Sequence, residues 1–330
     1  MRKKKTRRIL WGRIITIIVL VAILVGMGAF AINKYNYKKE QERRHEIVAE
    51  VVSRKNALDE KKAGLTNTRN LDEESWNSLM SMYDSWTVGY DENWNTYNDE
   101  TVEVPDGLTE KVQAWNPSKG EQLITLYEQA ELPDDYLVFL SRDDDRLQFV
   151  WDWKASHDKP YEDVALTESL DEVPHLLQWD ERWGYQPYGT STMVFAGCAP
   201  TSLSMVFSYL NQDPTITPYA VAQFSQDNGY FVDGVGTSHA MLPAAAQNWD
   251  ISCEGIPADV ETMTEALNAG KILVLSVDPG DFTRVGHFIV VTGMENGQFI
   301  VKDPNSNKNS KLWDPQRVVD QTRSVWAFSK

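Results

Sequence analysis

The residues of this chain best suited to chemistry are one cysteine, one histidine and one aspartate. Cys198 follows Gly197 and opens an apolar run, with Pro200 two positions later. Glycine allows a tight turn, and proline suits the first turn of a helix, where its missing N–H is not needed. A cysteine at a helix start meets the positive end of the helix dipole, which favours the nucleophilic thiolate. The pattern predicts a reactive cysteine, and an inert, buried thiol is the alternative.

A histidine able to serve that cysteine is His287. It stands between Gly286 and the apolar run Phe288–Val291, which is typical of a strand. An ionisable ring at the mouth of a buried strand needs a partner or a role, although a structural histidine with its hydrogen bonds satisfied would fit the same position. The other histidines lie in less suggestive places: His45 in a charged helical segment, His157 and His175 in polar sequence, and His239 at a predicted helix start.

Asp303 ends the strand that follows, so the turn between the strands decides whether it meets His287. A two-residue turn at Asn296–Gly297 would place Asp303 opposite Val290, on the wrong face. A three-residue loop over Met294–Asn296 would place the carboxylate beside the imidazole. We predict the second register, in which Asp303 holds the ring ready to accept a proton from the thiol. The predicted pairs are Val291 with Phe299, Ile289 with Val301, and His287 with Asp303.

Helices and then strands are predicted around these residues. Gly and Asn residues, capping side chains and apolar periodicity predict helices over 198–211, 218–229, 239–249 and 259–269. Strand patterns follow over 272–277, 287–293, 298–303 and 324–328. Helices followed by an antiparallel sheet predict an α+β fold.

The N-terminus predicts a membrane segment. Seven basic residues and no acid lie within residues 1–13, and residues 14–32 are 19 uncharged, mostly apolar residues. That length crosses a hydrocarbon core of roughly 30 Å. The basic cluster should stay in the cytoplasm, so the remainder faces outward. A signal peptide cleaved near Ala29–Ala31 is the alternative, which would give a secreted protein. We predict an uncleaved single-pass anchor.

Composition limits the remaining possibilities. The 330-residue chain has a formal charge of −16, and beyond residue 13 it carries 25 basic against 48 acidic residues. So acidic a body argues against binding nucleic acid. There are two cysteines, Cys198 and Cys253, and no Cys/His cluster at zinc spacing. We predict two free thiols.

The chain divides by composition into five parts. The predicted domains are a cytoplasmic basic tail (1–13), a transmembrane helix (14–32), a charged helical stalk (33–66), an aromatic-rich helical region with a linker (67–172), and the cysteine-bearing domain (173–330). In the fourth part, aromatic spacing predicts the core of a small helical unit rather than a ligand platform. Asp143–Asp145 lacks the pattern of a calcium loop and is interpreted as a solvated turn.

Four motifs in order carry a resemblance to a known family. They are Gly197–Leu203, Gly236–Ser238, Gly286–Gly293 and Asp303–Asn305. Together they resemble the papain-clan cysteine peptidases related to the bacteriocin-processing (double-glycine leader) peptidase domains. The likeness is closest to membrane-anchored or secreted members of Gram-positive bacteria. It covers about residues 173–330, and Ala199 stands where the family usually has glycine.

The resemblance implies a papain-like cysteine peptidase fold and a role for each motif residue. Cys198 would be the nucleophile, His287 the general base and then acid, and Asp303 the residue that orients the ring. The oxyanion would be held by the Cys198 backbone N–H and by a side-chain amide, for which Gln178 is the candidate. The implied activity is an extracytoplasmic thiol peptidase acting on a peptide or protein substrate, with no cofactor.

Two other functions fit the sequence. Other papain-clan families use the same residue order on peptidoglycan, so a cell-wall amidase or endopeptidase is one alternative. A catalytically inactive domain that binds peptides or a partner protein is the other. The domain could also cut its own chain in the linker at 154–172. Substrate and oligomeric state are not predicted.

Overall fold

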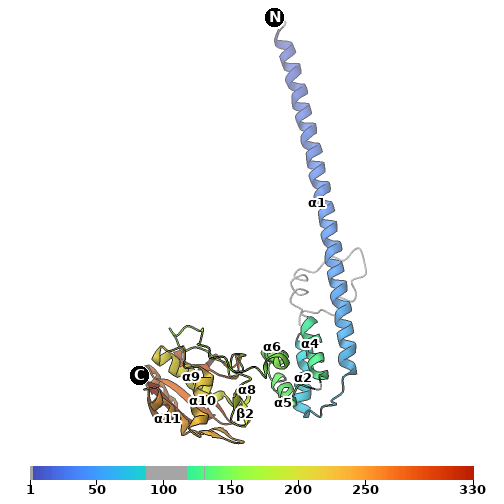
Figure 1. Ribbon diagram of the computed structural model, residues 1–330. Helices are drawn as coiled ribbons and strands as arrows, with labels where there is room; N and C mark the ends of the chain where they lie inside the picture. The colour runs from blue at the N-terminus through green and yellow to red at the C-terminus, as the bar shows by residue number, and fades with distance from the viewer. Residues whose placement is uncertain (1–2, 87–116, 130) are drawn as a thin grey trace. The chain divides into compact units, whose positions relative to one another are not determined.

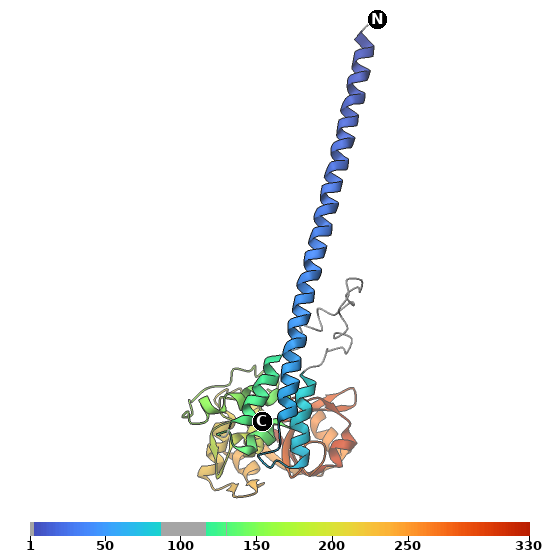
Figure 2. The same cartoon turned by 90° about the vertical axis from the view of Figure 1, so that its right-hand side faces the viewer.

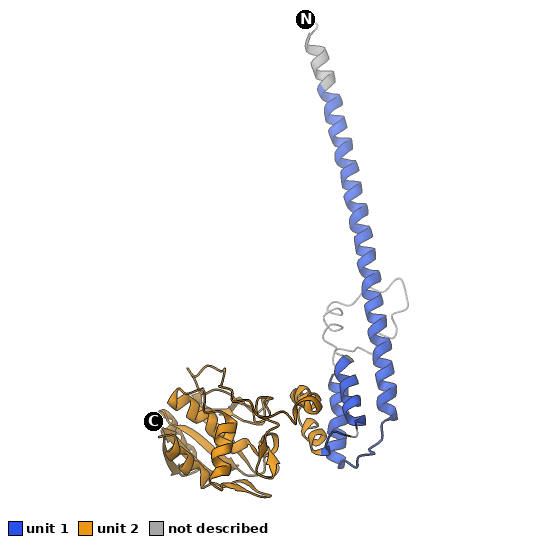
Figure 3. Ribbon diagram, viewed as in Figure 1, with its two compact units in different colours: residues 1–134 blue, residues 135–330 orange. Residues whose placement is uncertain are grey.

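A computed structural model describes residues 3–86, 117–129 and 131–330, with side chains described from Trp11 onward except that of Pro117. The chain forms two compact units, residues 1–134 and 135–330 (Figure 3). Each unit is described separately below. The limits of the five predicted parts stay predictions.

The first unit is helical and begins with one very long helix. Helix α1 runs without interruption from Lys3 to Gly64 (Figure 2). Its apolar side chains between Ile14 and Ile32 are exposed. It is long and apolar enough to cross a membrane. This is consistent with the predicted single span and equally with a signal sequence. Two shorter helices complete the described part of this unit, α2 (Glu73–Ser85) and α4 (Pro117–Glu128).

The C-terminal part of α1 contributes to the core of this unit. Val48 and Leu58 are buried, and α1 packs against α4. Among the aromatics, Tyr83 and Trp86 are buried, while Trp76 lies tilted against Tyr127 with ring centroids 5.4 Å apart. These rings serve as core, as predicted for the region. Four of the predicted aromatics, Tyr90, Trp94, Tyr97 and Trp115, lie outside the described residues.

The second unit contains helices on both sides of one sheet. Its helices are α5 (Asp134–Leu140), α6 (Leu147–Trp151), α7 (Trp153–Ser156), α8 (Met193–Ala196), α9 (Cys198–Asn211), α10 (Pro218–Asp227), α11 (Met241–Asn248), α12 (Val260–Asn268) and α13 (Pro315–Val319), with a 3₁₀ turn at Asp144–Arg146. All four helices predicted after residue 197 are present. Figure 1 shows α9, α10 and α11 gathered beside the sheet.

The sheet has six antiparallel strands. They are β5 (Ser252–Ile256), β6 (Ile272–Val277), β7 (His287–Glu295), β8 (Gln298–Lys302), β9 (Leu312–Trp313) and β10 (Thr322–Ser329). Their order across the sheet is β5-β10-β6-β7-β8-β9. Two further two-stranded ribbons are formed by β1 (Pro187–Tyr188) with β2 (Ser191–Thr192), and by β3 (Phe231–Val232) with β4 (Gly236–Thr237). The α+β prediction with an antiparallel sheet is confirmed.

Alternate residues of the sheet pack into two different cores. Val274 and Val290 lie in a cluster with Phe207 of α9, while Leu275 and Ile289 belong to a cluster with residues of α12. Side chains alternate between faces along a strand, so a sheet covered by helices on both faces buries every position. All six residues of β6 are buried for this reason.

The hairpin between β7 and β8 differs from the predicted one. The turn is the two-residue Asn296–Gly297, with φ of 53° and 76°, the left-handed pair typical of a type I′ turn. The predicted three-residue loop is therefore wrong. The register nevertheless shifts by one residue at Thr292, so that Val290 faces Lys302 rather than Asp303.

This bulge changes the face on which Asp303 lies. Without the extra residue Thr292, the two-residue turn would have placed Asp303 on the face away from His287. With Thr292 as an extra residue, the same register continued past Lys302 places Asp303 opposite Ile289. Ile289 lies on the same face of the sheet as His287. The predicted pairs were wrong, yet the two side chains lie on the same face.

Candidate active site

Cys198 is the first residue of α9, as predicted from the glycine and proline beside it. Gly197 comes so close to the preceding turn that an added Cβ would lie 2.5 Å from the Met193 carbonyl oxygen, which only glycine permits. Its own carbonyl accepts a hydrogen bond from Thr201 N at 3.0 Å. Cys198 is half-buried, and both it and Cys253 are free thiols, as predicted.

Helix α9 is joined to strand β7 one turn beyond the cysteine. The Ser202 hydroxyl donates a hydrogen bond to the Phe288 carbonyl at 3.4 Å. Ser202 lies four residues after Cys198, on the same side of the helix, and Phe288 is next to His287. This contact brings the thiol near the histidine, and Cys198 is among the groups that raise the pKa of His287.

His287 and Asp303 form a buried pair. The His287 Nε2 donates to Asp303 Oδ1 at 2.7 Å, and the two residues are 6% and 0% exposed. Because Nε2 faces the carboxylate, Nδ1 is the ring nitrogen that remains for Cys198. The ring thus lies between a thiol and a carboxylate, in the order that nucleophilic catalysis needs.

The electrostatics of this pair favour its charged form. Burial disfavours a proton on His287, but the charge and hydrogen bond of Asp303, together with Cys198, outweigh it and raise the pKa of His287 to about 10. Burial likewise opposes ionisation of Asp303, but the histidine and several hydrogen bonds hold its pKa below the usual value.

Both oxygens of the Asp303 carboxylate accept hydrogen bonds, which explains how the group can be buried. Oδ1 also accepts the Asn305 backbone N–H at 2.8 Å, and Oδ2 accepts from Asn309 Nδ2 at 3.1 Å. Buried acids are stable only when their oxygens are bonded in this way. The turn from Asp303 to Asn305 therefore has a fixed conformation.

His175 supports the same turn, which the sequence did not indicate. Its Nε2 lies 2.9 Å from the Asp303 carbonyl oxygen and 2.9 Å from the Ser310 hydroxyl. Burial, the largest cause, lowers the pKa of His175. The contact spans 128 residues of chain, so no local pattern could have pointed to it.

Gln178 contacts α8, the short helix that precedes α9. It is 2% exposed, and its Nε2 donates to the Val194 carbonyl at 2.7 Å, four residues before the cysteine. Its backbone N–H donates to the Pro304 carbonyl at 2.7 Å. The residue therefore links the segment before Cys198 to the segment after Asp303. One amide hydrogen remains beyond the bond to Val194.

The Asp143–Asp145 segment is not the solvated turn that was predicted. Asp143 is only 6% exposed and caps the 3₁₀ turn by accepting from Asp145 N at 3.1 Å. The Lys308 ammonium lies 2.9 Å from a carboxylate oxygen of both Asp143 and Asp144. The segment is acidic because it pairs with a basic residue from the far end of the chain, which a local pattern does not show.

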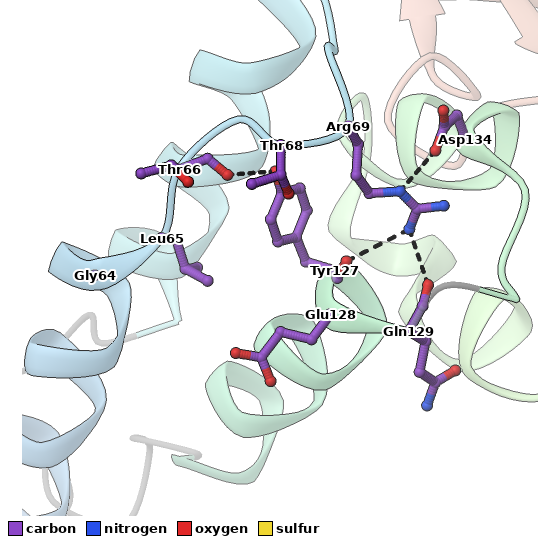
Figure 4. A pocket seen from close by; sticks show the side chains of 9 residues that line it. All are labelled: Gly64, Leu65, Thr66, Thr68, Arg69, Tyr127, Glu128, Gln129 and Asp134. Carbon is purple, nitrogen blue, oxygen red and sulfur yellow. Dashed lines mark hydrogen bonds and ion pairs between the residues drawn. The ribbon is translucent and has the colours of Figure 1, made fainter.

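A cleft in the first unit lies apart from these residues (Figure 4). It encloses ≈ 590 Å³ between the end of α1 and the end of α4. Arg69 within it makes an ion pair with Asp134 at 2.7 Å and donates to the carbonyls of Gln129 at 3.2 Å and Leu132. Its guanidinium is committed to joining these loops, so we assign the cleft a structural role.

Comparison with known proteins identifies the domain that carries Cys198. The model of the Peptidase_C39 like family matches residues 170–328. The match confirms the resemblance that the four motifs indicated. Comparison with the curated proteins gives no match.

Two solved structures are similar to part of the chain. One is the peptidase domain of Streptococcus ComA, a bi-functional ABC transporter involved in a quorum sensing pathway, with 19% identity over 41% of this chain and 93% of that one, and a TM-score of 0.33. The other is a C39-like peptidase from Bacillus anthracis, with 17% identity over 51% of this chain and 98% of that one, and a TM-score of 0.34. At TM-scores this low, neither likeness adds to the family match.

Proposed function

Because residues 170–328 form a domain of the Peptidase_C39 like family, we propose that this chain is a thiol peptidase with a papain-like catalytic arrangement. Cys198 is the nucleophile, His287 the general base and then acid, and Asp303 the residue that orients the ring. The observation that carries this proposal is the buried hydrogen bond between His287 and Asp303, with Cys198 close enough to act on the same imidazole.

The proposed reaction has two halves. In the first, the Cys198 sulfur attacks the carbonyl carbon of a peptide bond, and the proton held by His287 passes to the leaving amine as the C–N bond breaks. In the second, a water molecule attacks the resulting thioester and gives a proton to His287. The C–S bond then breaks, which releases the new carboxyl group and restores the thiolate–imidazolium pair.

Two groups can stabilise the negative oxygen formed in each half. The Cys198 N–H belongs to the first turn of α9, where backbone N–H groups have no partner within the helix. We assign the second donor to the Gln178 amide, whose buried position beside the Val194 turn supports this role. These groups and the triad perform the reaction without a bound cofactor.

The substrate class is a peptide or protein, as the family indicates. We further propose that the enzyme acts outside the membrane. The basic residues before Ile14 and the exposed apolar stretch of α1 support an N-terminus in the cytoplasm and a catalytic unit on the outer side. Cleavage of this segment as a signal would place the same unit outside the cell.

Hydrolysis by the detergent-solubilised full chain tests this function. We expect wild type to cleave members of a mixed peptide library and Cys198→Ala to cleave none, with new termini identified by mass spectrometry. His287→Ala should lose the same products, while Cys253→Ala should keep them. Equal cleavage by wild type and Cys198→Ala would contradict the proposal.

Purified peptidoglycan is the second substrate of the same experiment. Release of muropeptide fragments by wild type, with the peptide library untouched, would instead establish the cell-wall hydrolase. Binding of peptides without cleavage, unchanged in Cys198→Ala, would establish the inactive binding domain. A cut within residues 154–172 of the chain itself, absent from Cys198→Ala, would reveal self-processing.

A further inference from the structure

We propose that Arg146 is a positioning residue for the Asp303–His287 pair. The inference rests on the proposed function and extends it to a residue outside the matched domain, which begins at residue 170. Arg146 ends the 3₁₀ turn Asp144–Arg146 and does not touch the thiol or the imidazole. It acts through the turn that presents the Asp303 carboxylate.

The chain of contacts from Arg146 to the histidine is short. Arg146 Nη2 donates to the Asn305 carbonyl at 2.9 Å and to its side-chain Oδ1 at 3.1 Å. The Asn305 N–H in turn donates to Asp303 Oδ1 at 2.8 Å, the same oxygen that binds His287. The rigid guanidinium thus holds both the backbone carbonyl and the side chain of Asn305. This fixes the direction in which the Asn305 N–H points.

The arginine itself is held firmly. It is 4% exposed, its Nη1 donates to the Phe139 carbonyl at 2.8 Å, and its guanidinium lies over the Phe139 ring at 4.0 Å from the centroid. The charged groups that act on it are Asp143, Arg142, Asp303 and Asp145. A buried cation that moves away from its carboxylate neighbours is left as an unpaired charge, which costs more free energy than the same movement of a surface arginine.

Neighbouring contacts join the same two segments. Lys308 pairs with Asp143 and Asp144, and Asn307 Nδ2 donates to Asp145 Oδ2 at 3.3 Å. We call residues 143–146 the clamp. The clamp thus meets the segment 305–308 along its length, and Arg146 is the member that reaches the residue bonded to Asp303.

Arg146 of the clamp lies over the Phe139 ring of α5, and aromatic packing joins α5 and α6 to the segment that leads into α9. Tyr136 and Phe139 of α5 meet Phe195 of α8 edge-to-face, with centroids 5.1 and 6.0 Å apart. Phe149 stacks on Tyr185 at 4.2 Å. Such ring pairs stabilise a contact beyond the area that they bury. The clamp therefore links the Cys198 side of the site to the Asp303 side.

The test is the pH dependence of Cys198 alkylation in the full chain. If Arg146→Gln lets Asn305 and Asp303 shift, the pKa of His287 falls and the imidazolium stabilises the thiolate less. The midpoint of iodoacetamide labelling should then rise by about one pH unit, and hydrogen exchange of the Asp303 and Asn305 amides should become faster. Arg146→Lys, which keeps a charge and can make one bond, should recover part of the shift.

Arg142→Gln is the matched control, because it removes an exposed arginine four residues away. It should leave the labelling midpoint and the exchange unchanged. If Arg146→Gln does not fold, Asn305→Ala, which removes only the Oδ1 contact, should give a smaller shift in the same direction. A midpoint and exchange equal to wild type in Arg146→Gln, or in Asn305→Ala where that variant replaces it, would overturn the positioning role while leaving the peptidase intact. A wild-type Cys198 that labels like an ordinary thiol would instead contradict the proposed function, and the inference with it.

Discussion

Cys198 and Asp303 stand at opposite ends of the same proposed hydrogen-bonded triad, and they are held in place by different means. Cys198 is set by its neighbours in the sequence, because Gly197 and the first turn of α9 fix its backbone. Asp303 lies beyond the end of β8 and has no regular element of its own. Its turn is fixed by His175, Gln178 and Arg146, each more than a hundred residues away in the chain.

This difference predicts that the positions of Cys198 and Asp303 respond differently to substitutions elsewhere in the chain. A helix start is stable against distant substitutions, because its hydrogen bonds are local. A turn held by side chains from elsewhere depends on each of them, and small shifts of a catalytic group reduce rates strongly. Substitutions far from the chemistry should therefore act through Asp303 rather than through Cys198.

Loss of the thiol should give the largest effect. Cys198→Ala removes the nucleophile, so hydrolysis should fall by about 10³-fold or more. Cys198 contributes little to the core, so the thermal unfolding midpoint should stay close to that of wild type. Steady-state kinetics together with calorimetry check both statements, and activity retained at even a tenth would refute the assignment.

Changes at Asp303 should separate charge from position. Asp303→Ala leaves His287 without its partner and a buried site empty, so we expect a loss of about 10²–10⁴-fold in kcat/KM. Asp303→Asn keeps a side-chain oxygen that can still accept from His287 Nε2 and should lose less. If both variants lose equally, the negative charge and not the placement of the ring is decisive.

The stability of the second unit should depend on the charge of His287. Its pKa is raised to about 10 in the folded protein, against about 6.5 in an unfolded chain. The stabilisation is therefore complete below about pH 6.5 and is lost as the pH rises toward 10. The difference in unfolding temperature between wild type and His287→Ala should narrow over this range, and a constant difference would show that the pair is not charged.

Acidification should remove the contribution of Asp303. Its pKa lies below the usual value when folded, so its stabilisation is present above about pH 4 and disappears as the pH falls through the folded pKa. The same thermal unfolding series, extended to low pH with Asp303→Asn as the reference, checks this sign.

The smallest effect is expected at the hairpin turn. Gly297 has φ of 76° with open space around it, so Gly297→Ala meets only backbone strain and should destabilise by about 1 kcal/mol. Gly255→Ala, a glycine of β5 that also has open space but no positive φ, is the control and should not destabilise. Chemical denaturation measures both, and equal effects would argue against the two-residue turn.

The parts of the fold that depend on local sequence could be predicted. β6 was located at Ile272–Val277 because six apolar residues end at clear breaks, and α9 was located from Gly197 and Pro200. The edge strand Ser252–Ile256 was missed, because only its pairing with β10 identifies it. The hairpin was predicted wrongly because the bulge at Thr292 has no signature in the sequence, although Asn296–Gly297 is a strong turn signal.

The residues of the site that have a local signal in the sequence could likewise be predicted. Cys198, His287 and Asp303 were selected from their local contexts and from the family resemblance. The structure joins His287 to Asp303 and places Cys198 where it acts on His287, while the roles of all three stay predictions. Arg146 and His175 were not selected, because their contacts to residues 303–305 span 159 and 128 residues. A buried arginine within an acidic, aromatic region gives no signal until its partner is known.

The most direct measurement of the central claim is the alkylation of the two thiols across a range of pH. Cys253 is an internal reference, since burial first and Glu254 second raise its pKa to about 11. We predict that Cys198 is labelled well below pH 8 in wild type and only near the range of an ordinary thiol in His287→Ala, with Cys253 unchanged in both. Labelling of Cys198 with the same pH profile in wild type and His287→Ala would contradict the thiolate–imidazolium pair.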